Sequence, residues 1–425
     1  MINIRSVGVP GVILAIAASA LHSPLVVSTC LSVLASICTY NAIPLVSEVF
    51  IKHGRFGKDL LKEDRPIIPE SMGVVVGVVY FISMFLFIPV PFISWFNGVR
   101  EEGLDFPHHK FAQFLGGLLA LFSMLFLGFA DDVLDIRWRV KIWFPLIASL
   151  PLLMVYAVTY GGTDVLIPLP LRGFFSDKIL HLGIFYYGYM AALTIFATNA
   201  VNIVAGINGI EGGQTIIIAI SLAINDMVQI LTNPARRDAH MISLYFLLPF
   251  IGTTFGYLKH NWYPARAFGG DTFTYFAGMI FAVVGILGNF SKTVLLFMIP
   301  QIFNFVYSCP QLFHLVDCPR HRMPKINPKT SLIHPSTFDI SKSKPLGKLI
   351  IQIFKTLGLT HITIDPETKR PLATNFTLIN LVLVKFGPMS EAKTTLTVII
   401  IQALSSCLAF TIRYLLVHLV YNREE

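Results

Sequence analysis

A short charged segment between two long apolar stretches has the residue types of a catalytic or ion-binding site. Residues 129–141 read FADDVLDIRWRVK. If the preceding helix continues through them, Asp131 and Asp135 lie four residues apart and Asp132 and Asp135 lie three apart, so the carboxylates share one face. Like charges this close need a positive partner. The candidates are a divalent cation with oxygen ligands, or the cations that follow, Arg137, Arg139 and Lys141.

The alternative for this segment is a polar connector whose acids and bases neutralise each other in water. A second segment makes that alternative less attractive. Residues 198–214 contain three asparagines, Asn199, Asn202 and Asn208, and four glycines in an otherwise apolar sequence. Unpaired amides beside a membrane would cost roughly several kcal/mol each, so they need partners. A simple turn requires only one or two such residues. We therefore predict a binding site, with glycines that let the backbone approach a polar ligand.

Two further segments each carry an acid at the start of an apolar stretch. Glu70 follows the charged residues 58–65, and Asp271 follows Phe268, Gly269 and Gly270. Each acid has a structural explanation, because a carboxylate near a helix N-terminus interacts favourably with the backbone N–H groups. The alternative is ligand binding: Asp271 as a metal ligand, and Phe268 stacked on a flat ring.

The last segment is basic. Residues 318–324 read CPRHRMP, so Arg320 and Arg322 flank His321. Guanidinium groups bind phosphate oxygens in a bidentate manner. A basic cluster beside a membrane span is also typical of a topological anchor or a lipid-headgroup contact, and both interpretations remain open for this cluster alone.

The composition of the chain predicts that membrane-spanning helices position these candidate site residues. The chain has 425 residues, of which 54% are hydrophobic and only 13% charged, with a mean hydropathy of +0.69. This composition indicates an all-α polytopic membrane protein, because a helix needs about 20 apolar residues to cross the bilayer. We predict ten spans, within residues 24–50, 71–96, 111–130, 142–160, 184–201, 214–231, 241–258, 272–288, 293–313 and 396–421. Residues 7–21 either lengthen the first span, lie on the surface or cross separately.

The distribution of charge predicts the orientation. Lys and Arg concentrate in the loops around residues 52–65, 137–141, 259–266 and 314–393, which the ten-span prediction places on one face. The positive-inside rule makes that face cytosolic. Every chemically suggestive segment lies there. The five cysteines show no disulfide framework. The pI near 9.2 fits anionic headgroups or a phosphorylated substrate, so no nucleic acid partner is expected.

Residues 314–394 differ from the rest of the chain. We expect a small α/β insertion there, with residues 331–338 extended, an amphipathic helix over 344–357, and strands at 361–365 and 376–386 around a turn at 365–369. The predicted organisation is thus residues 1–313 with nine spans and the catalytic loops, residues 314–394 with the insertion, and residues 395–425 with the tenth span and the C-terminal tail.

Together these segments resemble the polyprenyl-phosphate N-acetylhexosamine-1-phosphate transferases. The resemblance rests on ADDVLD at 130–135, the Asn-rich segment 198–214, FGGD at 268–271 and RHR at 320–322, and it extends over nearly the whole chain from about residue 25. It is strongest to the eukaryotic branch, which transfers N-acetylglucosamine-1-phosphate from UDP-N-acetylglucosamine to dolichyl phosphate and releases UMP. The N-terminal apolar extension departs from the family pattern.

The resemblance also implies roles for individual residues. It assigns Mg²⁺ as the cofactor with Asn202 and Asp271 as ligands, Lys141 with nearby Asn199 to the lipid phosphate, and Asp131 and Asp132 as the catalytic pair. It places Arg320, His321 and Arg322 on the diphosphate, Asn208 and Phe268 on uracil, Leu60 and Glu70 around the uridine, and Trp138 with Arg322 at the sugar pocket. We favour positioning over general-base catalysis for the two aspartates, because a phosphate monoester is already largely ionised near pH 7.

The implied setting is the endoplasmic reticulum membrane, with the site facing the cytosol. The expected partners are UDP-N-acetylglucosamine, dolichyl phosphate, membrane lipid and a second copy of the chain in a homodimer. Two rivals remain open. One is a transferase for another amino-sugar donor or another polyprenol. The other is a transporter, in which intramembrane acids mark an ion path; the acids of this chain cluster on one face instead.

Overall fold

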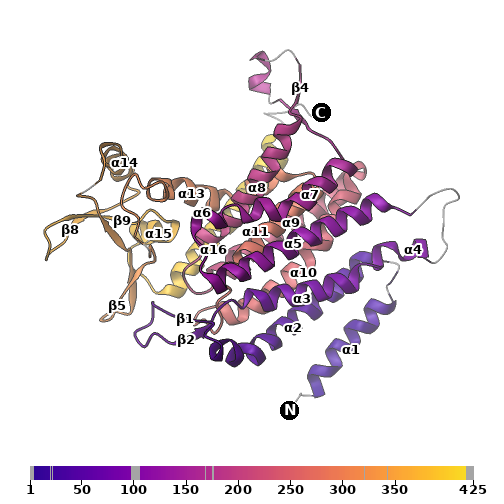
Figure 1. Cartoon of the computed structure of the whole chain (residues 1–425), viewed down its shortest axis with the longest axis horizontal. Helices are drawn as coiled ribbons and strands as arrows, with labels where there is room; N and C mark the ends of the chain where they lie inside the picture. The colour runs from indigo at the N-terminus through magenta and orange to yellow at the C-terminus, as the bar shows by residue number, and fades with distance from the viewer. Residues whose placement is uncertain are drawn as a thin grey trace.

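Long apolar helices form most of the computed structural model (Figure 1), which describes residues 4–19, 21, 23–96, 106–167, 169–174, 177–319, 321–341 and 343–417. Nine helices in this described part are long and apolar enough to cross a membrane. They are α2 (Pro24–Lys52), α3 (Gly73–Phe87), α5 (His108–Leu134), α7 (Phe144–Thr159), α8 (Ile184–Val204), α9 (Ile210–Thr232), α10 (Arg237–Asn261), α11 (Gly270–Leu287) and α16 (Glu391–Thr411). Short helical turns extend four of them: η1 (Val90–Phe92) after α3, α6 (Trp138–Lys141) before α7, η3 (Pro234–Arg236) before α10 and the π-helical turn η4 (Ile412–Leu416) after α16.

The remaining predicted span is broken. Helices α12 (Ser291–Phe297) and α13 (Ile299–Leu312) meet at an angle of 74° and together pass the same length and composition test. The predicted all-α architecture of about ten spans is therefore confirmed. Residues 7–19 of the N-terminal apolar segment fall within a separate helix, α1 (Ile4–Ser19), which lies beside α2 and ends before α2 begins. At 16 residues, α1 is shorter than the length needed to cross a bilayer upright.

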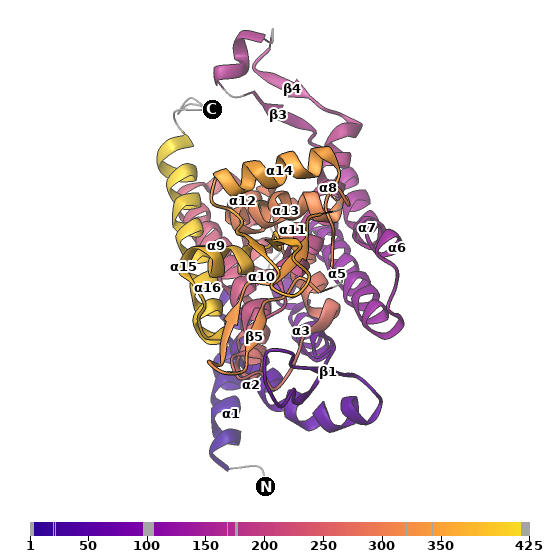
Figure 2. The ribbon, with the colours of Figure 1, turned by 90° about the vertical axis from the view of Figure 1, so that its left-hand side faces the viewer.

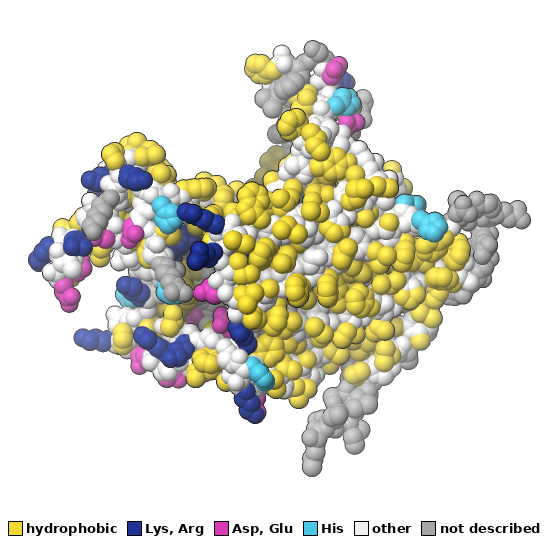
Figure 3. Space-filling view, in the orientation of Figure 1, with side chains coloured by type: hydrophobic (Ala, Val, Ile, Leu, Met, Phe, Trp, Pro, Cys, Tyr) yellow, Lys and Arg dark blue, Asp and Glu magenta, His cyan; other side chains and the backbone are white. Residues whose placement is uncertain are grey.

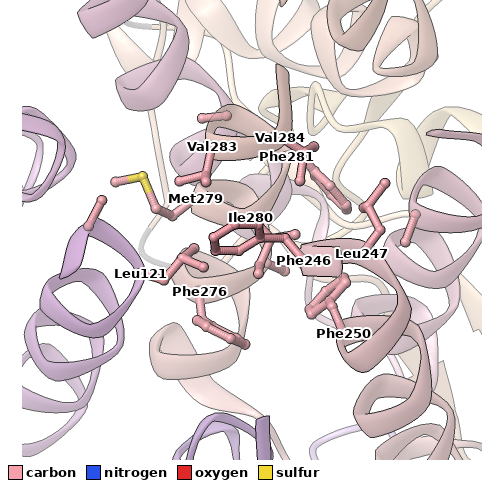
Figure 4. Close-up of a cluster of buried hydrophobic side chains, with 14 of the residues drawn as sticks. Leu121, Phe246, Leu247, Phe250, Phe276, Met279, Ile280, Phe281, Val283 and Val284 are labelled. Atoms are coloured by element: carbon pink, nitrogen blue, oxygen red, sulfur yellow. The ribbon is translucent and has the colours of Figure 1, made fainter. Parts of the chain in front are cut away.

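Helix α11 is the centre of the bundle. All its residues from Thr272 to Leu287 are buried, which is expected of a helix that is apolar on every side. Phe276 and Ile280 lie among side chains of α5 and α10, including Leu121 and Phe246 (Figure 4). Gly278 brings α11 against α8, because a Cβ atom there would lie 2.4 Å from the Cα atom of Thr198. The acid at the start of α11 is thus held on a rigid element.

The insertion is a small α/β unit packed on α13 (Figure 2). Its amphipathic helix, α14 (Pro345–Thr356), and its strand β8 (Ile362–Ile364) confirm the sequence prediction. Strands β7 (Thr337–Asp339), β9 (Pro371–Thr374) and β8 form an antiparallel sheet in the order β7-β9-β8. Strands β5 (Lys325–Asn327) and β6 (Leu332–His334) form a hairpin.

The strand predicted over residues 376–386 is wrong. This segment contains a helix, α15 (Leu378–Phe386), whose first turn is capped by the Thr377 hydroxyl, which accepts a hydrogen bond from the Asn380 N–H. Residues 378–383 are all buried, between the bundle and the core of the insertion. A short continuous apolar sequence fits a buried strand or a buried helix equally well, so only the surroundings decide. The predicted last boundary lies between residues 394 and 395, and the structure begins α16 at Glu391.

Charged side chains gather at one end of the molecule. Figure 3 shows Lys, Arg, Asp and Glu over the insertion and over the hairpin of β1 (Phe56–Lys58) and β2 (Ile67–Pro69), beside a broad apolar surface on the helices. The hairpin of β3 (Asp164–Leu166) and β4 (Ile179–His181) joins α7 to α8 away from this end (Figure 1).

Candidate active site

Two adjoining cavities lie at the charged end of the bundle. The larger has a volume of about 610 Å³ and the smaller about 200 Å³. Five residues line both: Glu70, Gly206, Glu211, Gly270 and Met323. They come from the first loop, the Asn-rich segment, the start of α11 and the segment after α13. Asp132, Trp138 and Lys141 of the charged segment line the larger cavity as well, so the segments singled out in the sequence converge on one place.

The predicted site residues other than Asp131 and Arg320 divide between the two cavities, and Asp131 lines neither. The larger cavity is lined by Asp132, Trp138, Lys141, Asn199, Asn202, Asp271, His321 and Arg322. The smaller is lined by Leu60, Asn208 and Phe268, and Glu70 faces both. Arg320 lies outside the described residues. Residues predicted to contact the nucleoside thus line the smaller cavity, and those predicted to contact phosphates, metal and sugar line the larger.

An ion-pair bridge connects two acids through Lys141. Its Nζ atom lies 2.9 Å from Oδ2 of Asp131 and 2.9 Å from Oδ2 of Asp271. Asp131 is buried and also accepts a hydrogen bond of 3.2 Å from the Tyr275 hydroxyl. One ammonium shared by two carboxylates offsets the cost of burying them. The positive partner of the acids is therefore Lys141, whereas Arg137 and Arg139 are exposed.

The preceding helix does not continue through the charged segment, so the condition under which the three aspartates would share one face is not met. Helix α5 ends at Leu134, and Asp135 takes a left-handed backbone conformation with φ of 48°. Asp135 is exposed. The left-handed residue turns the chain away from the helix, so Asp135 cannot project beside Asp131 and Asp132.

Asp132 caps another helix. Its Oδ1 accepts the Asp271 N–H at 2.7 Å, and its Oδ2 accepts the Thr272 N–H at 3.1 Å. These N–H groups belong to the first turn of α11, whose donors have no partner within the helix. Gly270 permits this approach, because it has φ of +70° and a Cβ atom there would lie 2.3 Å from Asp132 Oδ2. The capping explanation for Asp271 is therefore wrong, since Asp132 supplies the cap from α5.

Asn202 and Asp271 form a pair of oxygen-bearing side chains on the wall of the larger cavity. The Asn202 Nδ2 donates to Asp271 Oδ1 at 2.6 Å and to the Thr274 hydroxyl at 2.9 Å. Carboxylate and carboxamide oxygens suit Mg²⁺, which usually takes few protein ligands and completes its shell with phosphate oxygens and water. Among the described residues, no three His, Cys, Asp or Glu side chains gather as a metal site. The pair therefore fits a cation that a substrate helps to bind.

Arg322 presents an unsatisfied donor to the same cavity. Its Nη1 atom is buried and has no hydrogen-bond partner within the part of the chain that the structure describes. Burial lowers the pKa of the guanidinium, and a buried donor without a partner costs free energy. Its backbone is fixed, because the Arg322 carbonyl accepts from Asn380 Nδ2 at 2.7 Å and from the Ser336 hydroxyl at 3.1 Å. An anion at this wall would satisfy the guanidinium.

Both polar atoms of the Asn208 side chain at the smaller cavity have protein partners. Its Oδ1 accepts the Ala265 N–H at 2.8 Å, and its Nδ2 donates to Asp59 Oδ2 at 3.2 Å. Nearby, Oδ1 of Asn261 is buried without a partner among the described atoms. Glu211 accepts from the Tyr257 hydroxyl at 2.9 Å and faces both cavities.

Sequence reasoning assigned no role to Glu211, Asn261 or Glu391, which also lines the smaller cavity. Glu211 lies inside the Asn-rich segment, so its acidic side chain amid glycines was an available signal. Asn261 and Glu391 carry no local signal.

Two expectations about local roles need correction. Gly212 and Gly213 do not face a ligand: Cβ atoms there would meet Leu258 at 3.0 Å and Ile399 at 2.4 Å, so these glycines let α9 pack closely on α10 and α16. Of the four glycines in that segment, only Gly206 lines the cavities. Glu70 is not a helix cap, because α3 has Met72 at its N-cap position. Burial, with the nearby charge of Asp271, raises the pKa of Glu70.

Comparison with known proteins shows that the chain is similar to sugar-phosphate transferases. Residues 114–289 match the model of glycosyl transferase family 4. The chain is 47% identical to the UDP-N-acetylglucosamine–dolichyl-phosphate N-acetylglucosaminephosphotransferase of Schizosaccharomyces pombe over 95% of both chains. It is 42% identical to the Saccharomyces cerevisiae protein of the same name, over 95% of this chain and 94% of that one. A phospho-N-acetylmuramoyl-pentapeptide-transferase of Clostridium botulinum is 29% identical over 40% of this chain and 51% of its own.

Proposed function

The chain belongs to the family of UDP-N-acetylglucosamine–dolichyl-phosphate N-acetylglucosaminephosphotransferases, and from this we propose the reaction that it catalyses. An oxygen of dolichyl phosphate attacks the β-phosphorus of UDP-N-acetylglucosamine, a new P–O bond forms, and the bond from that phosphorus to the UMP oxygen breaks. The products are N-acetylglucosaminyl-diphosphodolichol and UMP. This is the first step of lipid-linked oligosaccharide synthesis for protein N-glycosylation.

The observation that carries the proposal for the site is the division of its lining residues. The smaller cavity holds Leu60, Asn208 and Phe268, which suit a nucleoside. The larger cavity adds Lys141 and Arg322 beside Asp271, which suit phosphate groups. A nucleoside diphosphate sugar bound across both cavities would place its base in the smaller and its diphosphate and sugar in the larger, with His321 near the phosphates and Trp138 near the sugar. The family resemblance assigns Arg320 to the diphosphate as well.

Lys141, Asp131 and Asp132 act by organising charge and by positioning other groups. Phosphoryl transfer depends mainly on positioning and electrostatic stabilisation. Asp131 and Asp271 hold the Lys141 ammonium where it can contact the lipid phosphate, with Asn199 on the same wall. Asp132 fixes the first turn of α11 and so fixes Asp271. Neither Asp131 nor Asp132 needs to remove a proton, because the acceptor phosphate is already largely ionised near pH 7.

We infer that the cofactor is Mg²⁺, held by Asn202 and Asp271. When bound, the cation neutralises charge on the diphosphate oxygens.

The inferred setting is the endoplasmic reticulum membrane, with both cavities facing the cytosol and the chain forming a homodimer. The gathering of basic residues at the cavity end supports this orientation. Membrane lipid surrounds the apolar helices, and the insertion over residues 314–394 lies on the cytosolic side.

UMP release tests the reaction and the metal site together. UDP-N-acetylglucosamine, dolichyl phosphate and Mg²⁺ are added to purified protein in detergent. UMP release should require both dolichyl phosphate and Mg²⁺. Asp271→Ala should reduce turnover at least about 100-fold, because it removes both a metal ligand and a partner of Lys141. Asp238→Ala, which removes an exposed acid paired with Lys110, is the control and should retain activity.

If Asp271→Ala still releases UMP in the presence of dolichyl phosphate, the proposed reaction stands and the proposed Mg²⁺ site is rejected. Transport of labelled donor across sealed vesicles without any UMP release would reject the transferase.

A further inference from the structure

Glu391, the first residue of the last span, lies at the smaller cavity rather than in solvent. It is 4% exposed and lines the cavity together with Asn208. Its Oε1 accepts the backbone N–H of Asn208 at 2.7 Å. One turn further along α16, the Thr395 hydroxyl donates to the Asn208 carbonyl at 2.7 Å. Both main-chain groups of Asn208 are therefore held by a helix 183 residues away in the sequence.

The same carboxylate closes a ring of polar contacts. Glu391 Oε2 pairs with the Lys62 ammonium, whose Nζ lies 3.1 Å from Asp59 Oδ2. That aspartate oxygen accepts from Asn208 Nδ2 at 3.2 Å. Burial disfavours the Lys62 ammonium, but the hydrogen bond and charge of Glu391, together with Asp59, outweigh it and raise the pKa of Lys62. The ring joins the first loop, the Asn-rich segment and the last helix.

Helix capping does not explain Glu391. Ser390 is the N-cap residue of α16, and its hydroxyl accepts the Lys393 N–H. Glu391 instead directs its oxygens at the cavity wall, where the two buried acids need the ammonium and the Asn208 donors as partners. Asp59, Lys62 and Glu391 all lie outside residues 114–289, the segment that matches the family model.

We propose that Glu391 is a positioning residue for the nucleoside half of the donor site, a role that rests on the proposed function. It holds the Asn208 backbone and, through Lys62 and Asp59, the Asn208 side chain. The wall that meets the base is thereby fixed before the nucleotide binds. Preorganisation of this kind stabilises the bound state of the nucleotide and leaves the acceptor phosphate, in the larger cavity, unaffected.

The test compares kinetic constants for the two substrates. Glu391→Ala should raise the KM for UDP-N-acetylglucosamine about 10-fold, while kcat and the KM for dolichyl phosphate change less than about 3-fold. Glu391→Gln keeps an acceptor for the Asn208 N–H and should raise the donor KM by a smaller factor. Ser390→Ala is the matched control, since it weakens the start of α16 without touching the ring, and its donor KM should equal that of the parent protein.

A direct binding readout separates this inference from the proposed reaction. UMP should raise the unfolding temperature of the parent protein, and Glu391→Ala should need about 10-fold more UMP for the same rise. An unchanged donor KM and UMP requirement in Glu391→Ala would overturn the inference while leaving the transferase intact. Equal losses for both substrates would also overturn it, by showing a general structural role. Absence of UMP release from the parent protein would reject the proposed function instead.

Discussion

At the scale of single residues, neighbouring aspartates have different surroundings because consecutive residues of a helix project about 100° apart. Asp131 faces Lys141 and Tyr275, within the bundle. Asp132 faces the start of α11, where it accepts from two backbone N–H groups. The first organises charge, and the second fixes the helix that carries Asp271.

We therefore expect Asp132→Ala to destabilise the protein by about 1–2 kcal/mol, the usual effect of removing a helix cap. Asp132→Asn, which keeps an oxygen acceptor, should destabilise it less. Thermal unfolding in detergent measures both. The control is Asp135→Asn, which removes the charge of the exposed third acid of the same segment and keeps a residue that tolerates the left-handed conformation of that position; it should change stability by less than about 0.5 kcal/mol. Equal stability of Asp132→Ala and Asp135→Asn would argue against the cap.

At the scale of elements, the break between α12 and α13 determines where the segment after α13 lies. The Phe297 carbonyl at the break accepts from Gln402 Nε2 of α16 at 2.9 Å. Gln301 of α13 donates to the side-chain oxygens of Gln402 at 2.8 Å and Gln214 at 2.9 Å. All three glutamines are buried. Inside a membrane a freed carbonyl has no water as a partner, so this amide chain stabilises the bend.

Gln402→Leu should lower the free energy of unfolding by about 1–3 kcal/mol, because it leaves a Gln301 donor and the Phe297 carbonyl without partners. Thermal unfolding in detergent is again the measurement. Gln229→Leu serves as the control, since the Gln229 amide makes a longer contact of 3.3 Å to Tyr414 in a less buried position. If both variants lose the same stability, the bend does not depend on the glutamine chain.

Helix α13 also fixes the insertion. The Ser308 hydroxyl donates to the Phe376 carbonyl at 2.6 Å, and Asn304 Oδ1 accepts the Leu378 N–H at 2.7 Å. Asn380 of α15 then holds the Arg322 carbonyl. The bend, the insertion and the cavity wall at Arg322 are therefore mechanically connected, which explains how an element outside the bundle contributes to the site.

At the scale of the whole molecule, charge separates from apolar surface (Figure 3). Both cavities and the insertion lie at the charged end, and the β3–β4 hairpin lies elsewhere. This asymmetry predicts that the insertion faces the cytosol and the β3–β4 hairpin faces the lumen.

Cysteine labelling tests this orientation. In sealed microsomes with the cytosolic face outward, a membrane-impermeant maleimide should label Lys348→Cys on α14 without detergent. It should label Asp177→Cys, beside β4, only after permeabilisation. The parent protein, which has five cysteines, gives the background. Labelling of Asp177→Cys in intact vesicles would reverse the proposed orientation.

The sequence by itself determined the membrane class, the ten apolar segments, the charged face and twelve of the residues that line the cavities. These features depend on local composition. The thickness of the bilayer fixes the length of an apolar segment, and the Lys and Arg content of a loop determines its side of the membrane without regard to tertiary contacts. The four motifs were also recognisable because polar residues at a membrane edge stand out in an apolar chain.

Only the tertiary structure decided which partner each polar group has. It made Asp132 a cap for a helix 139 residues away, turned residues 378–386 into a helix whose first six residues are buried, and brought Glu391 to Asn208. It also assigned Gly212 and Gly213 to helix packing. These outcomes depend on contacts between segments far apart in the chain, and the free energy of a buried polar group is set by those contacts and not by its neighbours in sequence.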